Sequence, residues 1–468
     1  MLVKFRVKNF RSFKDMNEFS MVKGKQRFYE DRISEVDNTK VLKFSAIFGA
    51  NAAGKSNLIR AMKVMQWIVL NNRVPNDAFE EYFKLDHQCK QLPTYFEMVF
   101  TIGEEIFSYG FEIGLSNRIV ESEWLFKLHK KNDGSISEKM IFEKQNNNFK
   151  FGSSVISNRL LMYKEDIKIM KTSLFLTHVA FNKFVFMQNN NDEIALSILK
   201  VFDWFQSSLR VLYTGEALYS PELTSSINEK SIGQLLSYFD TGIKSIELKS
   251  CDEYEFRKDI GPIGFDQLSL QNALEQKNRF APNEKPSFIL RTASDIWVIQ
   301  SENHRLIYKR LYFYHDEERK DPFRVSNESD GTLRLFELAE ALLNNNLDRT
   351  IAVDELDRCM HPTLTIQYVK SFLARALKKE SRSQLIVTTH ESRLMDLDIL
   401  RRDEIWFVKK DNNESKIYSL EEFNVRFDLI VDKAYLDGRY GGVPVFDSIF
   451  FPESIRHENR KQFIRKKK

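Results

Sequence analysis

The chain has 468 residues, of which 42% are hydrophobic and 29% are charged, and its formal net charge is only +4. This length predicts two or three domains, or one domain with a large insertion, and the composition is that of a folded protein with a core. The small net charge gives no reason to expect general nucleic-acid binding, and no apolar run approaches the roughly 20 residues that a membrane helix needs.

The cysteines and the start of the chain indicate the compartment. Cys89, Cys251 and Cys359 are far apart and lack the spacing of metal ligands, which favours free thiols in a reducing environment. The first 11 residues carry several Lys and Arg side chains but contain no apolar signal core. We therefore expect a cytoplasmic protein that does not interact with membranes.

Strand patterns dominate the first 128 residues. Residues 2–10 alternate apolar and basic side chains, as a half-buried strand does. Further strand-like runs between residues 94 and 128 are separated by glycines and Asn117, as in hairpins. We expect a mixed or antiparallel sheet that forms a first lobe over residues 1–128.

Within this lobe, a phosphate-binding loop joins a strand to a helix. Residues 41–48 are more continuously apolar than the first strand, residues 49–56 match G-x-x-x-x-G-K-[ST], and residues 56–70 have a helical pattern. In such a loop Lys55 would reach the β- and γ-phosphate oxygens, and the Ser56 hydroxyl would bind Mg²⁺. The flanking strand and helix favour a nucleotide site over a chance glycine-rich turn.

The chain changes character between residues 129 and 242. Helical patterns cover residues 173–186, 193–212 and 231–239, which predicts a mainly helical insertion. The insertion lacks the heptads of long coiled-coil arms, and we expect it to be the specificity element. Strand-like runs then return over residues 243–325.

A second group of chemically active residues lies within residues 326–445. An apolar helical pattern begins after Ser329, and an apolar strand at residues 350–353 ends in Asp354 and Glu355. In a Mg-nucleotide site the first carboxylate holds the metal and the second polarises the attacking water.

A histidine ends the next predicted strand, residues 384–389. A lone histidine at a strand end is usually structural, but after the carboxylate pair we favour a role for His390 as a sensor of the γ-phosphate. The chain closes with a basic tail, residues 446–468, which is either simply solvated or contacts an acidic partner or nucleic acid.

Short motifs give the chain a resemblance to a known family. The motifs are Asn9-Phe10-Arg11-Ser12-Phe13, Gly49-Ala50-Asn51, Ser329-Asp330-Gly331-Thr332 and Met360-His361-Pro362. With them the chain resembles the ABC/SMC-related AAA ATPases, which include Rad50-like and overcoming-lysogenisation-defect proteins. Residues 328–332, 402–407 and 438–441 are most similar to ATPases of bacterial abortive-infection systems against phages, such as the RloA/AbiL-like proteins and the ATPase subunit of PARIS.

The resemblance implies an α/β fold, namely an ABC-type P-loop ATPase head with a mixed or antiparallel N-terminal sheet, a parallel core sheet and a helical insertion. It also implies ATP and Mg²⁺ as cofactors and hydrolysis of ATP to ADP and phosphate. The implied nucleotide contacts are Gly49, Asn51, Ala53, Gly54, Lys55, Ser56, Asn57, Arg11, Ser329 and Gly331; the metal ligands are Ser56 and Asp354; the catalytic residues are Glu355 and His390. Asp330 and Thr332 depart from the family signature Ser-Gly-Gly-Gln, and we assign no glutamine to the family's Q-loop.

The resemblance further implies partners. In ABC heads the phosphate loop of one subunit faces the signature of another, so we expect a homo-oligomer, at least a dimer, with composite ATP sites. Asp396 and Asp398 have the spacing of a TOPRIM metal site, but they lie in a stretch that belongs to the ATPase pattern. We therefore expect nuclease or toxin chemistry on a separately encoded effector, with a phage trigger protein and nucleic acid as further candidate partners.

Three interpretations remain open. The chain is a sensor or scaffold in phage defence, a Rad50/RecF-like DNA-repair ATPase, or a toxin whose insertion carries its own activity. The absence of heptads from the insertion disfavours a Rad50-like form. The absence of a metal-binding or Cys/His cluster from the insertion disfavours the self-contained toxin.

Overall fold

The computed structural model describes most of the chain. The described residues are 1–131, 133–146, 148–154, 156–182, 192–214, 222–224, 228–260, 274, 287–292, 294–302, 305–343, 348–377, 381–423 and 431–443. The expected basic tail, residues 446–468, lies outside them. Within the described ranges, no helix has both the length and the apolar character that crossing a membrane requires.

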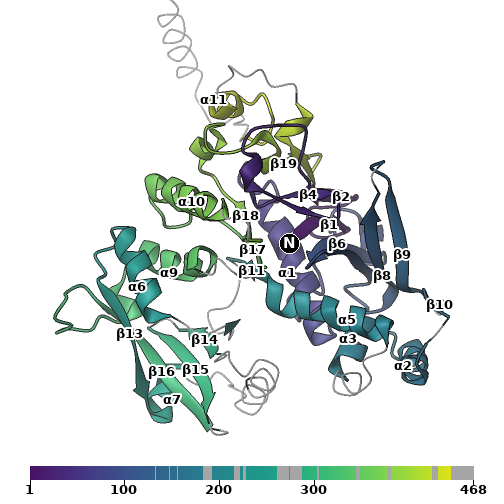
Figure 1. Ribbon diagram of the computed structural model, residues 1–468, viewed down its shortest axis with the longest axis horizontal. Coiled ribbons are helices and arrows are strands. Elements are labelled where there is room, and N and C mark those ends of the chain that lie inside the picture. The colour runs from purple at the N-terminus through teal and green to yellow at the C-terminus, as the bar shows by residue number, and fades with distance from the viewer. Residues whose placement is uncertain are drawn as a thin grey trace, which may run out of the picture.

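A central sheet positions the chemically active residues (Figure 1). In the described part of the chain its strand order is β11-β17-β18-β5-β19-β20. The strands are β5 (Phe44–Phe48), β11 (Leu209–Leu212), β17 (Thr350–Val353), β18 (Gln384–Thr388), β19 (Ile405–Asp411) and β20 (Glu414–Ser419). Neighbouring strands from β11 to β19 are parallel, whereas β20 pairs with β19 in an antiparallel hairpin. The carboxyl ends of β5, β17 and β18 therefore meet at one edge of the sheet.

Both faces of this central sheet are covered, which explains why its strands are continuously apolar in sequence. Ile47, Ala352 and Ile386 belong to one hydrophobic cluster, together with helix α1 (Lys55–Asn71). The alternate residues of the same strands belong to a second cluster, together with α9 (Asp330–Leu343) and α10 (Pro362–Ala376). The helix after the phosphate loop and the helix after the signature motif thus lie on opposite faces of the sheet.

An antiparallel sheet flanks the α1 side of the central sheet. Its strand order is β10-β9-β8-β7-β6-β1-β2. The strands are β1 (Leu2–Lys8), β2 (Asn17–Ser20), β6 (Thr94–Ile102), β7 (Glu105–Ile113), β8 (Val120–Lys130), β9 (Ile136–Gln145) and β10 (Asn148–Phe151). Helices α1, α3 (Phe175–Phe181) and α5 (Glu193–Asp203) share its hydrophobic cluster, and α2 (Asn158–Ile169) packs on α3. A small hairpin of β3 (Ile33–Val36) and β4 (Thr39–Leu42) lies beside it.

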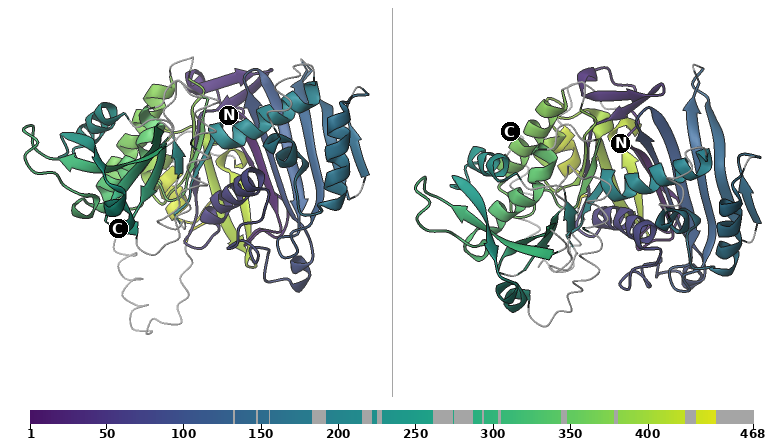
Figure 2. Two further views of the ribbon diagram at one scale, coloured as in Figure 1. Left: turned by 90° about the horizontal axis from the view of Figure 1, so that it is seen from below. Right: turned by 60° about the horizontal axis from the view of Figure 1, so that its bottom comes forward.

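A third sheet lies on the α9 side, so that the central sheet separates the two outer sheets in both views of Figure 2. Its order is β12-β14-β15-β16-β13. The strands are β12 (Glu222–Thr224), β13 (Ser245–Cys251), β14 (Ser287–Arg291), β15 (Ile296–Glu302) and β16 (Arg305–Tyr314). Helix α6 (Glu229–Tyr238) packs on β13 and α9. Helix α7 (Glu253–Ile260) forms a separate hydrophobic cluster with β14–β16. Helix α11 (Val431–Leu436) comes after β20, the last strand of the central sheet, in the sequence.

The segment 129–242 differs from the mainly helical insertion that we expected. Strands β9 and β10 extend the antiparallel sheet, and the predicted helix 193–212 ends early, because Leu209–Leu212 form an edge strand of the central sheet. Leu209 and Val211 are buried in the cluster with α1, and the strand pairs in parallel with β17. Long-range pairing therefore outweighs the local helical pattern.

Candidate nucleotide site

The phosphate loop follows β5 directly and leads into α1, as the sequence predicts. Gly54 caps the helix with a φ of 114°, a conformation that favours glycine. A Cβ at Gly54 would lie 2.4 Å from the Ser415 hydroxyl oxygen, and a Cβ at Gly49 would lie 2.4 Å from the Val408 carbonyl oxygen. The strand hairpin β19–β20 thus encloses the loop so closely that both positions require glycine.

Lys55 turns back over the loop that precedes it. Its Nζ donates hydrogen bonds to the carbonyl oxygens of Gly49 (2.8 Å) and Ala50 (3.1 Å). Burial lowers the pKa of the Lys55 ammonium to about 8, and the negative charges of Asp354, Asp357 and Glu355 act in the opposite direction. The ammonium therefore lies within electrostatic range of the carboxylates that follow β17, and it has no salt bridge to any described residue.

A chain of polar side chains fixes the other side of the loop. The Ser415 hydroxyl donates to the Ala53 carbonyl oxygen at 2.5 Å and accepts a hydrogen bond from the Ser12 hydroxyl at 2.7 Å. The amide of Asn57 also donates to Ser12, at 2.7 Å. Ala53, Ser12 and Asn57 are thus held together around the start of α1.

Arg11 connects this network to a charged cluster. Its guanidinium donates to the Asn57 side-chain oxygen (3.1 Å), to the Tyr213 hydroxyl (3.2 Å) and to Glu81 (2.9 Å). Arg60 pairs with the same Glu81 at 3.1 Å. Arg11 is only partly buried, so it lies beside the start of α1 at the border of the site.

The first carboxylate of β17 is fully buried and hydrogen-bonded. Asp354 is 0% exposed, and its two oxygens accept hydrogen bonds from Thr214 (2.7 Å) and Thr388 (2.7 Å). Thr214 follows β11 and Thr388 ends β18, so both neighbouring strands of β17 orient this carboxylate. The direction of this buried carboxylate is therefore fixed by two threonine hydroxyls.

The second carboxylate occupies an unusual backbone conformation. Glu355 has a φ of 50°, which is costly for a residue with a side chain. Its backbone N–H donates to the Thr388 hydroxyl at 2.7 Å, and its carbonyl oxygen accepts from Arg334 at 2.8 Å. Arg334 lies on α9 and also donates to the Asp354 carbonyl oxygen at 2.7 Å. The signature helix therefore contacts the backbone that carries both carboxylates.

His390 lies just beyond β18, near the same carboxylates. Its backbone N–H donates to both carboxylate oxygens of Asp357 at 3.2 Å. Burial is the largest cause that lowers the pKa of the His390 ring, and the positive charge of Lys55 lowers it further. The ring is therefore neutral at neutral pH, in the electrostatic environment of Lys55.

The signature motif is separate from the phosphate loop. The Ser329 hydroxyl caps the start of α9 by accepting from the Thr332 N–H at 3.1 Å, and a Cβ at Gly331 would lie 2.7 Å from the Cys359 carbonyl oxygen. Ser329 and Asp330 are exposed. In the described part of the chain, no hydrogen bond joins residues 329–332 to residues 49–56.

These residues form a donor set that fits a Mg-nucleotide. A buried ammonium, a helix N-terminus preceded by a glycine-rich loop and a hydroxyl at Ser56 suit phosphate groups, and carboxylate oxygens suit Mg²⁺. The structure brings Arg11, Asn57, Lys55, Asp354 and Glu355 to one region and leaves the signature on another face.

Several residues of this site were not identified from the sequence. They are Ser12, Glu81, Tyr213, Thr214, Arg334, Thr388 and Ser415. Thr388 directly precedes Thr389-His390, and Ser12 lies within the Asn-Phe-Arg-Ser-Phe motif. Both residues therefore lie in or next to stretches that the sequence analysis had singled out. The others come from distant parts of the chain.

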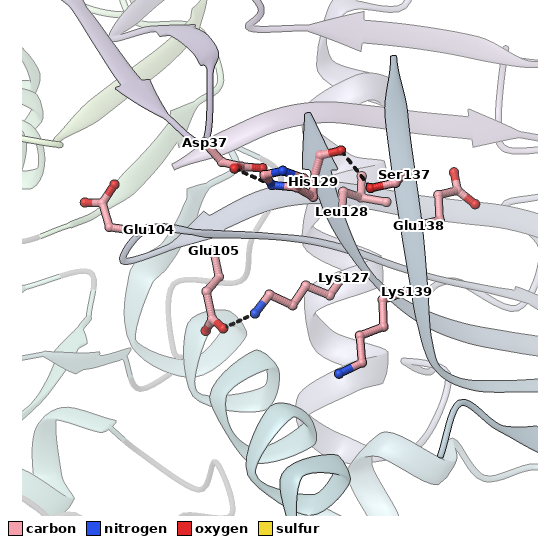
Figure 3. A pocket seen from close by; sticks show the side chains of 9 residues that line it. All are labelled: Asp37, Glu104, Glu105, Lys127, Leu128, His129, Ser137, Glu138 and Lys139. Atoms are coloured by element: carbon pink, nitrogen blue, oxygen red, sulfur yellow. Dashed lines mark hydrogen bonds and ion pairs between the residues drawn. The ribbon is translucent and has the colours of Figure 1, made fainter. Parts of the chain in front are cut away.

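A separate hollow of about 350 Å³ lies at the start of β7 and over β8 and β9. Figure 3 shows two pairs of side chains that point towards each other, Asp37 with His129 and Glu105 with Lys127. The first pair is 2.6 Å apart and the second is 2.5 Å apart. Because these side chains are already paired within the chain, we assign no ligand to the hollow.

Comparisons with known proteins identify the family of the chain. A family model described as "AAA domain, putative AbiEii toxin, Type IV TA system" matches residues 44–151 and 197–396, which include the phosphate loop, the carboxylate pair and His390. No curated protein sequence matches the chain significantly.

Two solved structures are similar at low identity. The SMC head domain from Thermotoga maritima is 15% identical, with 89% of this chain and 98% of that chain covered and a TM-score of 0.33. An SMC head bound to the C-terminal winged-helix domain of ScpA is 14% identical, with 89% and 97% covered and a TM-score of 0.35. The family match spans more than half of the chain, and the chain therefore belongs to this AAA-domain family.

Proposed function

We propose that the chain binds ATP with Mg²⁺ and hydrolyses it to ADP and phosphate. The observation that carries this proposal is the buried Lys55 ammonium, which follows a glycine-rich loop at a helix N-terminus and lies within electrostatic range of Asp354 and Glu355. Residues 49–56 would bind the phosphates, with Gly49, Asn51, Ala53 and Gly54 supplying backbone contacts.

In this proposal, different residues bind the metal and orient the attacking water. Ser56 and Asp354 would hold Mg²⁺, which neutralises charge on the phosphate oxygens. Glu355 orients the attacking water and accepts its proton, and neutral His390 hydrogen-bonds the γ-phosphate. Arg11 and Asn57 would contact the nucleotide at the border of the loop.

Each site requires a second subunit in this proposal. Ser329 and Gly331 lie at the N-terminus of a 14-residue helix, on the face of the central sheet opposite to α1. A helix N-terminus favours negative charge, so this exposed end would bind the γ-phosphate held by another copy. The expected assembly is therefore at least a dimer that closes around ATP.

We further propose that the ATPase is the sensor or scaffold of a bacterial abortive-infection system against phages, and that it holds and releases a separate toxic effector. The family description, which refers to a toxin–antitoxin system, supports this role. Asp396 and Asp398 lie in an exposed turn, where Asp396 accepts the Asp398 N–H at 2.9 Å. This geometry favours a local turn over a metal site, so a TOPRIM nuclease, if present, would be the effector.

The test of the ATPase is hydrolysis by the purified full chain with Mg-ATP. Lys55→Ala should weaken nucleotide binding and abolish hydrolysis, whereas Lys84→Ala is the matched control, because Lys84 pairs with Glu80 on the surface. Hydrolysis by Lys55→Ala at the wild-type rate would contradict the proposal.

The test of the defence role is co-expression with the product of the adjacent gene. Alone, the chain should hydrolyse ATP without toxicity and without cleaving nucleic acid. Together, the two proteins should form a complex whose release depends on Glu355. Nuclease activity that survives Lys55→Ala and is lost in Asp396→Ala/Asp398→Ala would refute the separate effector, and ATP-dependent DNA binding without any effector would favour the DNA-repair alternative.

A further inference from the structure

The last described segment of the chain lies against the first glycine of the phosphate loop. After α11 the chain turns through Gly438, Gly441 and Gly442, with φ values of 80°, 68° and 75°. A Cβ at Gly442 would lie 3.4 Å from the Val408 carbonyl oxygen and 3.6 Å from the Cα of Gly49. Gly442 therefore lies beside the start of the loop, at a spacing that a single added Cβ would close to van der Waals contact.

Tyr435 joins this turn to the loop. Its hydroxyl donates to the Gly442 carbonyl oxygen at 3.0 Å. Burial raises the pKa of Tyr435 to about 12, and the nearby backbone of Gly49 acts in the opposite direction. One hydroxyl thus lies between the C-terminal turn and the residue that opens the phosphate loop.

The ring of Tyr435 is also fixed by the strands beneath the loop. It stacks on Phe407 with ring centroids 5.5 Å apart and packs on Phe48 at 6.4 Å. Phe48 immediately precedes Gly49, and Phe407 pairs with Phe48 across the sheet. The position of the hydroxyl is therefore set by the same strands that set the position of the loop.

Helix α11 contacts the other end of the site as well. It packs against the short helical turn Ser392–Met395, which follows His390. Val431 and Ala434 share the hydrophobic cluster with Leu394 and Met395. The C-terminal segment thus spans the site from the start of the phosphate loop to the segment beyond the histidine.

We propose that Tyr435 and Gly442 are positioning residues of the nucleotide site, which hold Gly49 in the conformation that receives phosphate. The inference rests on the proposed ATP binding and adds a C-terminal support for it. A loop held in its binding conformation before the ligand arrives binds more tightly, because less conformational freedom is lost on binding. The two residues therefore set nucleotide affinity, without contacting the reacting atoms.

The chain contains a matched control for Tyr435. Tyr440 also stacks on Phe407, with the same centroid distance of 5.5 Å and an interplanar angle of 18° against 19° for Tyr435. Its buried hydroxyl, however, has no hydrogen-bond partner among the described residues. Tyr435→Phe and Tyr440→Phe thus remove the same atom from similar rings, and only the first removal affects the loop.

The experiment measures the dissociation constants of ADP and Mg-ATP for the full chain, with kcat, KM and thermal midpoint for each variant. Tyr435→Phe should weaken nucleotide binding about threefold to tenfold, the range that corresponds to one lost hydrogen bond. The value of kcat at saturating ATP should stay at the wild-type level, because the catalytic carboxylates are untouched. Tyr440→Phe should bind nucleotide as the wild type does.

A second pair of variants tests the contact at Gly442. Gly442→Val and Gly438→Val introduce the same backbone strain, because both glycines have a φ near 80°. A Cβ at Gly438 would meet only the Val443 side chain, at 3.4 Å. Gly442→Val should therefore weaken nucleotide binding more than Gly438→Val, even where the two variants lose thermal stability equally.

The outcomes separate this inference from the proposed function. A wild-type chain that binds neither ADP nor ATP overturns the proposed function itself. A wild-type chain that binds nucleotide, with Tyr435→Phe and Tyr440→Phe binding equally, overturns only the inference. Loss of thermal stability in Tyr435→Phe with an unchanged dissociation constant also overturns it, because that result shows a purely structural role.

Discussion

The two candidate anion-binding loops of this chain are surrounded to very different degrees. The phosphate loop is enclosed by the hairpin β19–β20, by Ser12 and by the C-terminal turn, and Lys55 is only 5% exposed. The signature loop is capped by its own Ser329 and Thr332, and its first two residues are exposed. Residues of the same chain enclose the phosphate loop, whereas the signature loop is exposed. We call the phosphate loop with its carboxylates the enclosed half of the proposed site, and the signature loop the open half.

The halves are nevertheless in contact within one chain. Arg334 lies one turn after the signature and donates to the carbonyl oxygens of Asp354 and Glu355. Thr214 and Thr388 orient the Asp354 carboxylate from the two neighbouring strands. A change at the exposed signature would therefore reach the carboxylates of the same chain through α9, since side chains in a packed core move together.

The largest expected effect is in the enclosed half. Glu355→Gln keeps the shape of the side chain but removes the base that polarises water. We expect kcat to fall by on the order of a hundredfold or more, with ATP binding retained. Single-turnover hydrolysis and a binding titration measure the two quantities separately. Hydrolysis at the wild-type rate would show that Glu355 is not the base.

The next effect tests the open half. Ser329→Arg should abolish hydrolysis by obstructing the signature, and Lys55→Ala should abolish it by removing the phosphate contact. Mixed in equal amounts, the two variants should recover about a quarter of the wild-type rate, because half of random dimers are mixed and each has one intact site. No recovery on mixing, with both variants folded, would contradict sites shared between subunits.

A smaller effect tests the contact between the halves. Arg334→Ala removes two hydrogen bonds to the backbone of Asp354 and Glu355, and the left-handed conformation of Glu355 loses its support. We expect about a tenfold loss of kcat with nucleotide affinity little changed. Glu337→Gln, which alters the other partner of Arg334, should have a much weaker effect. Equal effects of the two variants would argue against a positioning role.

The smallest expected effect is the dependence of ATP affinity on pH. Burial lowers the pKa of Lys55 to about 8 in the free chain, and a bound polyphosphate would raise it again. Binding therefore favours the protonated form, so ATP affinity should be full below pH 8 and fall as the pH rises through that value. Between pH 7 and pH 8.5 the loss should be about threefold to fourfold. A nucleotide titration across this range checks it, and Lys55→Ala should show no such dependence.

Local sequence pattern predicted the two motifs of the enclosed half of the site, but it did not indicate the residues that contact them. The phosphate loop and Asp354-Glu355 are contiguous motifs, each attached to a strand with a clear apolar pattern, so local pattern predicted them and the fold places them together. Ser415, Thr214 and Arg334 reach the site from distant segments, and nothing local marks them. Leu209–Leu212 were predicted as helix because pairing with β17 is not visible in local periodicity.

The central claim is that two copies complete each other's nucleotide site, and the mass of Glu355→Gln in solution tests it most directly. This variant should bind Mg-ATP without consuming it, so the closed state accumulates. Light scattering on the full chain should show a dimer with Mg-ATP, and Ser329→Arg/Glu355→Gln should give no ATP-dependent dimer. A Glu355→Gln chain saturated with ATP that remains strictly monomeric would contradict the account.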